Sequence, residues 1–144
     1  MTRPAAPEVK LTRTISDYAQ FGEAVVALAL AALMVKAPFR LAVRSMALNR
    51  GASREDTQEA ASIVRAIHRA ARRVPWTSVC FDQGLALHWM LRRRGQRSIL
   101  HYGIQQRDKK LSAHVWVSLG DDILIGEAEA DSHTRVATFP AQPA

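Results

Sequence analysis

Apolar residues in the first half of the chain recur at the spacing of helices. From about Ser16 to Val35, alanine and leucine dominate and no proline interrupts, which predicts a long helix. Pro38 ends it, and a second short helix is expected from Phe39 to Leu48, before a turn at Asn49-Arg50-Gly51. Residues 1 to about 12 hold two prolines and scattered polar groups, so we expect a loosely ordered start.

Two more helices follow. Ser53 and Asp56 resemble a capping box, and the helix after them is predicted to end near Arg73. One apolar face runs along it at three- and four-residue spacing: Ala60, Ile63, Val64, Ile67 and Ala71. The next helix is expected from about Val79 to Arg94, with Thr77 or Ser78 as its N-cap and Gly95 just past its end.

Beyond Gly95 the pattern changes to that of strands. Residues 98–105, 112–119 and 123–125 read as three strands, joined by a polar connector at 107–110 and a tight turn at 120–122. Connections this short favour antiparallel pairing. The order predicts an α+β fold in which N-terminal helices precede a cysteine-bearing helix packed on a small antiparallel sheet. We expect an N-terminal helical segment, 1–50, and a core, 51–144, that form one compact unit.

Composition narrows the class of partner. The 144 residues are 48% apolar, enough for a real core, and carry a formal charge of +7. Such a charge suits nucleic acid, an anionic membrane or an acidic polypeptide, but it is spread along the chain without a nucleic-acid reader motif, so we expect no nucleic acid. The apolar stretch Ala24–Val35 is too short to span a bilayer and lacks a following cleavage site, which favours a buried helix. Peripheral membrane contact is the alternative, because Lys36, Arg40 and Arg44 follow that stretch.

The single cysteine, Cys80, excludes an intramolecular disulfide and a cysteine-based metal site, and indicates a reducing, cytoplasmic setting. Its position in the first turn of the third clear helix matters chemically. Free backbone N–H groups and the positive end of the helix dipole favour the thiolate and could hold an oxyanion during acyl transfer. A lone cysteine is also compatible with an inert core residue, so its meaning depends on a partner base.

Five histidines compete for the role of base. His114 begins a strand and would project toward a packed helix end, whereas His88 is two turns along the cysteine helix and out of reach. His101 on the first strand remains a rival, and a structural role for His114 stays open. His68 is expected on a solvated helix surface and His133 in an irregular tail.

A third group should orient the imidazole of the base through its other ring nitrogen. Glu127 follows the third strand and could return to the level of His114. Glu129 is an alternative, and Asp121 and Asp122 are expected to be solvated in the turn. The carboxylates of this region could equally be exposed surface groups that take no part in a site. The scattered histidines predict no metal site, and the absence of a phosphate-binding loop predicts no nucleotide cofactor.

Three runs carry a family resemblance: PWTSVCFDQGLALHWMLRRRG, LHYGIQQ and AHVWVSLGDDILIGE. In this order and spacing they resemble the lasso-peptide leader peptidases, transglutaminase-like cysteine proteases known as the B-protein family, which cut the leader from a ribosomally made precursor. The resemblance covers about residues 74 to 140, including the closing VATFP, and the APFRLAVR run is similar to that family's N-terminal segment.

The resemblance implies a papain- or transglutaminase-like fold, with Cys80 as nucleophile and His114 as general base. The family's acidic third residue, commonly aspartate, falls at or beside Gly126-Glu127, so Glu127 is the best match after a shift of one residue. Gln83, one helical turn beyond Cys80, could line the site or serve the helix structurally.

The expected function is therefore that of a cysteine peptidase, a hydrolase that removes the leader from a lasso-peptide precursor. The resemblance also implies a separate leader-recognition protein and an ATP-dependent macrolactam synthetase as partners, and no cofactor of its own. Two alternatives remain: an acyltransferase of the transglutaminase type that uses the same residues, and a non-enzymatic adaptor that binds peptide through its basic surface.

Overall fold

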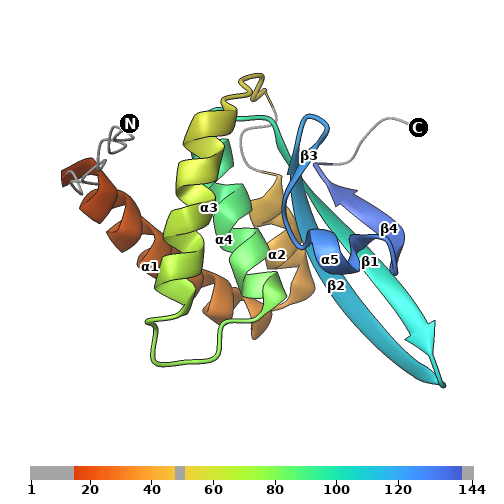
Figure 1. Cartoon of the computed structure of the whole chain (residues 1–144). Helices are drawn as coiled ribbons and strands as arrows, with labels where there is room; N and C mark the ends of the chain where they lie inside the picture. Colours follow the sequence, from red (N-terminus) through yellow and green to blue (C-terminus); the bar gives the residue numbers. More distant parts are fainter. Residues whose placement is uncertain (1–14, 48–50, 141–144) are drawn as a thin grey trace, which may run out of the picture.

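The computed structural model describes residues 15–47 and 51–140. The loosely ordered start predicted for residues 1–12, the end of the second helix at Leu48, and Asn49 and Arg50 of the predicted turn lie outside this part of the chain. The helices between residues 15 and 93 gather on one side of a four-stranded sheet, and a hairpin formed by residues 98–119 projects beyond the body (Figure 1). The α+β plan predicted from the sequence is confirmed.

Four helices form the first half of the fold: α1 Ile15–Val35, α2 Phe39–Met46, α3 Thr57–Ala71 and α4 Cys80–Arg93. All four agree with the periodicity of the sequence to within a few residues. Two predicted caps are wrong. The N-cap of α3 is Asp56, whose side chain accepts a hydrogen bond from the N–H of Glu59 at 3.0 Å, not Ser53. The N-cap of α4 is Val79 rather than Thr77 or Ser78, and the Asp82 carboxylate accepts from the Val79 N–H at 3.4 Å.

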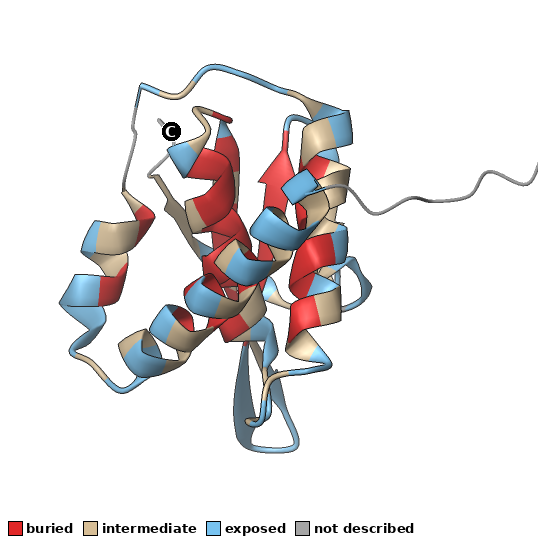
Figure 2. Ribbon diagram, turned by 90° about the vertical axis from the view of Figure 1, so that its left-hand side faces the viewer, coloured by how far each residue is buried: buried red, intermediate tan, exposed pale blue. Residues whose placement is uncertain are grey.

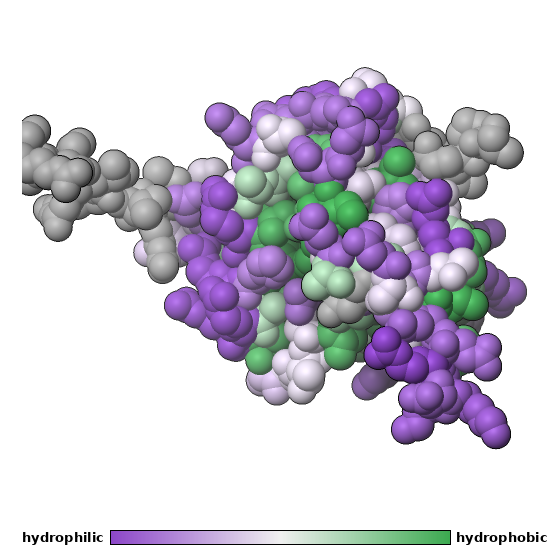
Figure 3. Space-filling view, turned by 45° about the vertical axis from the view of Figure 1, so that its right-hand side comes forward, coloured by the Kyte–Doolittle hydropathy of each residue, from purple (hydrophilic) through white to green (hydrophobic). Residues whose placement is uncertain are grey.

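The second half is the sheet, whose strands are β1 Ser98–Arg107, β2 Lys110–Leu119, β3 Asp122–Ile125 and β4 Thr134–Phe139. Their spatial order is β3-β2-β1-β4, and every neighbouring pair is antiparallel. A two-residue turn joins β1 to β2, where Asp108 and Lys109 both have positive φ, as tight hairpin turns require. The projecting end of this hairpin is hydrophilic (Figure 3).

The segment after β3 corrects the sequence prediction of an irregular tail. A short helix, α5 Glu127–Ala130, packs along β2, and β4 then pairs with β1 on the far edge of the sheet. Val136 and the residues before it are exposed, so β4 lacks the strong apolar alternation that marks the other strands. Its pairing with β1 brings residues 134–139 back beside the first strand.

Helix α4 forms the centre of the core, between the sheet and the helices α1 and α3 (Figure 2). It lies so close to β2 that a Cβ atom on Gly84 would come within 2.9 Å of the Val115 side chain. Helix α1 approaches α3 and α4 through small and branched residues: Ala24, Ala27, Leu28 and Ala31. The 21 residues of α1 are long and apolar enough to cross a membrane, and only 22% of its most apolar stretch is buried, so the expectation of a buried helix too short to span a bilayer is wrong in both length and burial. One such helix near the start of a chain is weak evidence for a membrane span, because core helices and signal sequences have the same length and composition.

Buried polar groups fix α2 and α4 relative to each other. His88 of α4 donates through Nε2 to the carbonyl oxygen of Met46 at 2.8 Å, and its Nδ1 lies 2.9 Å from Ser98 Oγ. Because a carbonyl oxygen only accepts, Nε2 carries the proton and Nδ1 accepts from the serine hydroxyl. Burial lowers the pKa of His88 to about 4, so the ring is neutral at pH 7. This neutral histidine ties the end of α2 to the helix that begins with Cys80.

Candidate functional site

Cys80 is the first residue of α4, and its side chain is exposed. The backbone N–H groups of a helix's first turn have no acceptor within the helix. The turn that precedes α4 is held by the Asp82–Val79 hydrogen bond, which positions the cysteine at the helix start. A sulfur here is open to a substrate and lies at the positive end of the helix dipole.

His114 lies in β2 and is buried, with 7% of its surface exposed. Its Nε2 is 3.2 Å from the carbonyl oxygen of Gly126, in the segment that follows β3. Because a carbonyl only accepts, Nε2 must carry a proton in this contact, which leaves Nδ1 as the basic nitrogen of the neutral ring. A hydrogen bond from Nε2 to the Gly126 carbonyl favours this tautomer and restrains the ring, which is the kind of contact that the third group of a catalytic triad makes.

Gly126 can approach this closely because it has no side chain. Its φ is +83°, a conformation that residues with a Cβ rarely adopt. A Cβ placed there would lie 2.7 Å from the Val115 carbonyl oxygen and 3.0 Å from His114 Nε2. Gly126 thus contributes to the site in two ways: its carbonyl group contacts the imidazole, and its lack of a side chain leaves space for the ring.

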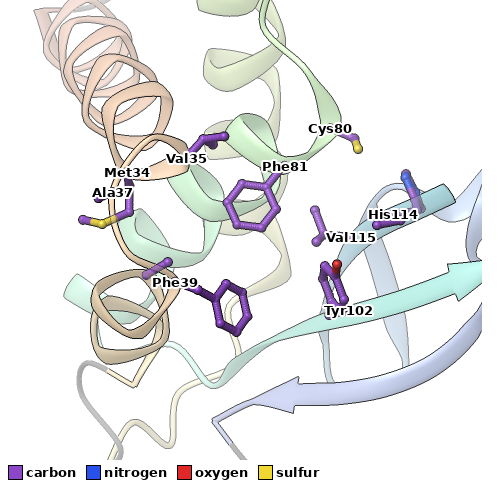
Figure 4. A pocket seen from close by; sticks show the side chains of 11 residues that line it. Met34, Val35, Ala37, Phe39, Cys80, Phe81, Tyr102, His114 and Val115 are labelled. Atoms are coloured by element: carbon purple, nitrogen blue, oxygen red, sulfur yellow. The ribbon is translucent and has the colours of Figure 1, made fainter. Parts of the chain in front are cut away.

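Cys80 and His114 line the same two cavities. The first, of about 270 Å³, is mostly apolar, and Figure 4 shows the cysteine sulfur and the His114 ring facing one gap at its end. Its walls come from the end of α1, from α2, from the start of α4 and from β1 and β2: Met34, Val35, Ala37, Phe39, Ala42, Phe81, Tyr102, Ala113 and Val115. The rings of Phe39 and Tyr102, 6.5 Å apart between centroids, join α2 to β1 along this wall.

The second cavity, of about 460 Å³, is more polar and lies toward the end of β3. Gln83 and His133 line it together with Cys80 and His114. Gln83 donates to the carbonyl oxygen of Ser78 at 3.3 Å, so it supports the turn before α4 as well as the cavity wall. The two cavities meet at the cysteine–histidine pair, which gives a substrate chain an apolar side and a polar side.

His133 enters the site although the sequence analysis placed it in an irregular tail. Its ring lies 5.4 Å from that of His114, and its nitrogens contact the hydroxyl groups of Ser112 at 3.3 Å and Ser132 at 3.1 Å. The residue sits just before β4, so its position depends on a strand pairing that local patterning did not reveal. No signal in the sequence singled it out.

The other histidines lie elsewhere. His101, the rival base, stacks on Trp116 with ring centroids 5.4 Å apart and contacts Ser118 Oγ through Nε2 at 2.8 Å. Burial, and secondarily the charge of Arg135, lowers the pKa of His101 to about 4. His68 is exposed on α3, as expected from its surroundings. Neither cavity beside Cys80 is lined by these residues.

The acidic candidates are spread over the turn and α5. Glu127 is the first residue of α5 and is exposed, and Asp121 and Asp122 are exposed in and beside the β2–β3 turn. Glu129 also belongs to α5, but its side chain lies outside the described part of the structure. Among residues 15–47 and 51–140, no group of three or more His, Cys, Asp or Glu side chains is placed to hold a metal ion.

The geometry suits nucleophilic acyl chemistry: an exposed thiol at a helix start, an oriented imidazole across the cleft, and two adjoining cavities for a substrate. Comparisons with curated proteins and with solved structures found no match. A family model described as the transglutaminase-like superfamily matches residues 24–138, which run from within α1 through α4 and the sheet to the last residue but one of β4. The chain belongs to the transglutaminase-like superfamily, whose fold is of the cysteine protease and acyltransferase type.

Proposed function

We propose that this protein is a cysteine peptidase that removes the leader from a ribosomally synthesised, lasso-type precursor peptide. The observation that carries the proposal is the meeting of Cys80 and His114 at the junction of two cavities. The choice of a lasso precursor rests on the resemblance of the runs around these two residues to leader peptidases.

The reaction follows from the placement of the two side chains. Nδ1 of His114 takes the thiol proton, and the Cys80 sulfur attacks the carbonyl carbon of the scissile peptide bond. N–H groups in the first turn of α4 stabilise the resulting oxyanion. Protonated His114 gives its proton to the leaving amine as the C–N bond breaks, leaving a thioester on Cys80. Water then attacks the thioester, its proton passes to His114, and the carboxylic acid and free thiol are released.

Two groups in the segment that follows β3 have supporting roles in this mechanism. The Gly126 carbonyl, 3.2 Å from Nε2, holds the ring in the tautomer that leaves Nδ1 basic. The carboxylate of Glu127, carried by the next residue, adds negative charge near the imidazolium ion. Because Glu127 is exposed, solvent screens most of this contribution.

The proposal includes partners and a compartment. A separate leader-recognition protein would present the precursor, and an ATP-dependent macrolactam synthetase would use the freed core peptide. Hydrolysis requires no cofactor bound to this chain, and a thiol nucleophile suits the reducing cytoplasm.

Mass spectrometry of a lasso-type precursor incubated with this protein and a leader-recognition protein tests the proposal. Wild-type protein should release one leader-sized product, and the Cys80→Ala variant should leave the precursor intact. Adding an excess of a primary amine distinguishes acyl transfer, because transfer leaves a product heavier by the amine. An intact precursor in both reactions, with binding of the partners demonstrated, would contradict the peptidase and favour an adaptor.

A further inference from the structure

The short helix α2 places basic and apolar side chains side by side at the mouth of the apolar cavity. Ala42 and Met46 are buried, whereas Phe39, Arg40 and Arg44 are exposed. Positions four apart lie above one another on a helix, so Phe39 and Val43 form one row and Arg40 and Arg44 form the next. A surface depression follows this helix, lined by Phe39, Arg40, Leu41, Val43 and Arg44.

Phe39 connects this depression to the catalytic cleft. The same residue lines the cavity that contains Cys80 and His114, where its ring faces Tyr102 (Figure 4). A chain that leaves the cleft on the apolar side therefore crosses Phe39 and reaches the row formed by Arg40 and Arg44. The His88–Met46 hydrogen bond fixes this helix relative to α4, so the path has a defined geometry.

The two arginines of α2 are available for a partner. In the described part of the chain neither has a carboxylate within ion-pair distance. The arginines at the end of α4 differ, because Arg93 and Arg94 both pair with Glu23 at 2.6 Å. Among residues 15–47 and 51–140, Arg40 and Arg44 thus form a cationic row that no carboxylate neutralises, beside exposed apolar side chains.

We propose that the face of α2 formed by Phe39, Arg40, Val43 and Arg44 binds an acidic, amphipathic segment of the same peptide whose scissile bond lies at Cys80. The apolar positions of that segment pack on Phe39 and Val43, and its carboxylates pair with the two arginines. The surface thereby selects substrates by an acidic segment outside the cleavage position. This inference rests on the proposed peptidase function, because it takes the cleft as the origin of the path.

A binding experiment tests this without turnover. The probes are two fluorescein-labelled synthetic peptides of equal length, each with leucine at every third or fourth position and either glutamate or lysine at the others. Fluorescence anisotropy with full-length Cys80→Ala protein should show at least tenfold tighter binding of the glutamate peptide at low salt. The R40E/R44E double variant should abolish or reverse this preference, and R40Q/R44Q should reduce it partway.

The matched control is R107E/K110E, which removes the same charge from the exposed tip of the β1–β2 hairpin. Its affinity for the glutamate peptide should stay within twofold of the parent. An equal loss in both double variants would reduce the effect to general electrostatic attraction and overturn the proposal. Circular dichroism and thermal melting confirm that each variant is folded.

Three further outcomes separate the competing interpretations. If R40E/R44E abolishes flotation with phosphatidylglycerol vesicles but leaves peptide affinity unchanged, the face binds membrane and the proposal is wrong. If the wild-type protein cleaves its precursor and R40E/R44E cleaves equally well, this inference fails while the peptidase function stands. If peptide binding behaves as expected but no precursor is cleaved, the peptidase function fails and the acidic-peptide surface stands.

Discussion

The side chains on the two faces of strand β2 differ in what they contact. Val115 and Val117 point toward α4, where the closest approach is to Gly84, and contribute to the core. His114 and Trp116, which alternate with them, form the other set, and their rings stack with centroids 6.3 Å apart. Because successive side chains of a strand point to opposite faces, one short segment places core valines on one side and the proposed base on the other. Substitutions at neighbouring positions should therefore affect different properties.

The largest expected effect comes from the pair His114→Ala and Val117→Ala. Loss of the proposed base should lower the cleavage rate by about 10²- to 10⁴-fold, the usual range for general acid–base catalysis, with little change in melting temperature. Val117 is fully buried and lies away from both cavities, so Val117→Ala should cost about 2 kcal/mol of folding free energy. Urea unfolding and single-turnover cleavage, measured on both variants, test the contrast.

The opposite pattern would break the comparison. If His114→Ala unfolds the protein while Val117→Ala loses turnover per folded molecule, the division between the two faces of β2 does not hold. Measuring the rate only on protein shown to be folded keeps the two properties separate.

A second contrast, in the dependence of stability on pH, involves His88. Its pKa is lowered to about 4, mainly by burial, whereas an unfolded histidine titrates near its model value of 6.5. Between these values the unfolded chain binds more protons, so His88 stabilises the fold fully above pH 6.5 and loses that contribution as the pH falls toward 4. The difference corresponds to about 3 kcal/mol. Unfolding free energies from pH 8 to 4 should fall accordingly, with a shallower slope in His88→Gln.

His101 offers the matching variant on the other face of the sheet. Its pKa is also lowered to about 4, by burial first and by Arg135 second, so the sign of its contribution is the same. His101→Gln should also flatten the slope, and the double variant should flatten it further. Unchanged slopes in both single variants would show that neither ring is kept neutral by the fold.

Gly126 provides a third test, at the point where the backbone orients the base. Gly126→Ala places a Cβ at positive φ, 2.7 Å from the Val115 carbonyl oxygen, and should cost about 2 kcal/mol of stability. The same Cβ crowds His114 Nε2, so turnover should fall at least tenfold in the folded fraction. Gly22→Ala is the control, because that helix position has open space around it and alanine should stabilise by about 0.5–1 kcal/mol.

Local patterning predicted those parts of the fold that depend on local interactions. The helices and the first three strands follow from apolar spacing, and Cys80 lies at a helix start as expected. His114 was expected to begin a strand, but β2 begins at Lys110 and His114 lies within it. The catalytic roles of both residues stay predictions. β4 was missed because its six residues obtain their order from pairing with β1, some 35 positions earlier. α5 is shorter than two helical turns, too short for a periodic signal.

The site was only partly predictable for the same reason. Phe39 and Tyr102 meet across the cavity although more than 60 residues separate them, and nothing in either local pattern indicates the contact. His133 depends on β4, which was not predicted. The suggestion of a side-chain acid as the orienting group stays a prediction. The Gly126 carbonyl that lies 3.2 Å from His114 Nε2 could not be predicted, because every residue has a backbone carbonyl and the sequence does not distinguish this one.

The smallest expected effect concerns that acid. Glu127 is exposed while the Gly126 carbonyl already contacts His114 Nε2, so Glu127→Gln should slow cleavage only about threefold, the order of a screened surface charge. Glu129→Gln, assayed beside it, tests the second carboxylate of α5, and Asp121→Asn serves as an exposed control in the turn. A hundredfold loss in either glutamate variant, with an unchanged melting temperature, would assign the orienting role to a carboxylate. If the cleavage rate falls threefold or less in all three variants, the orienting role is assigned to the backbone carbonyl of Gly126, which no side-chain substitution removes.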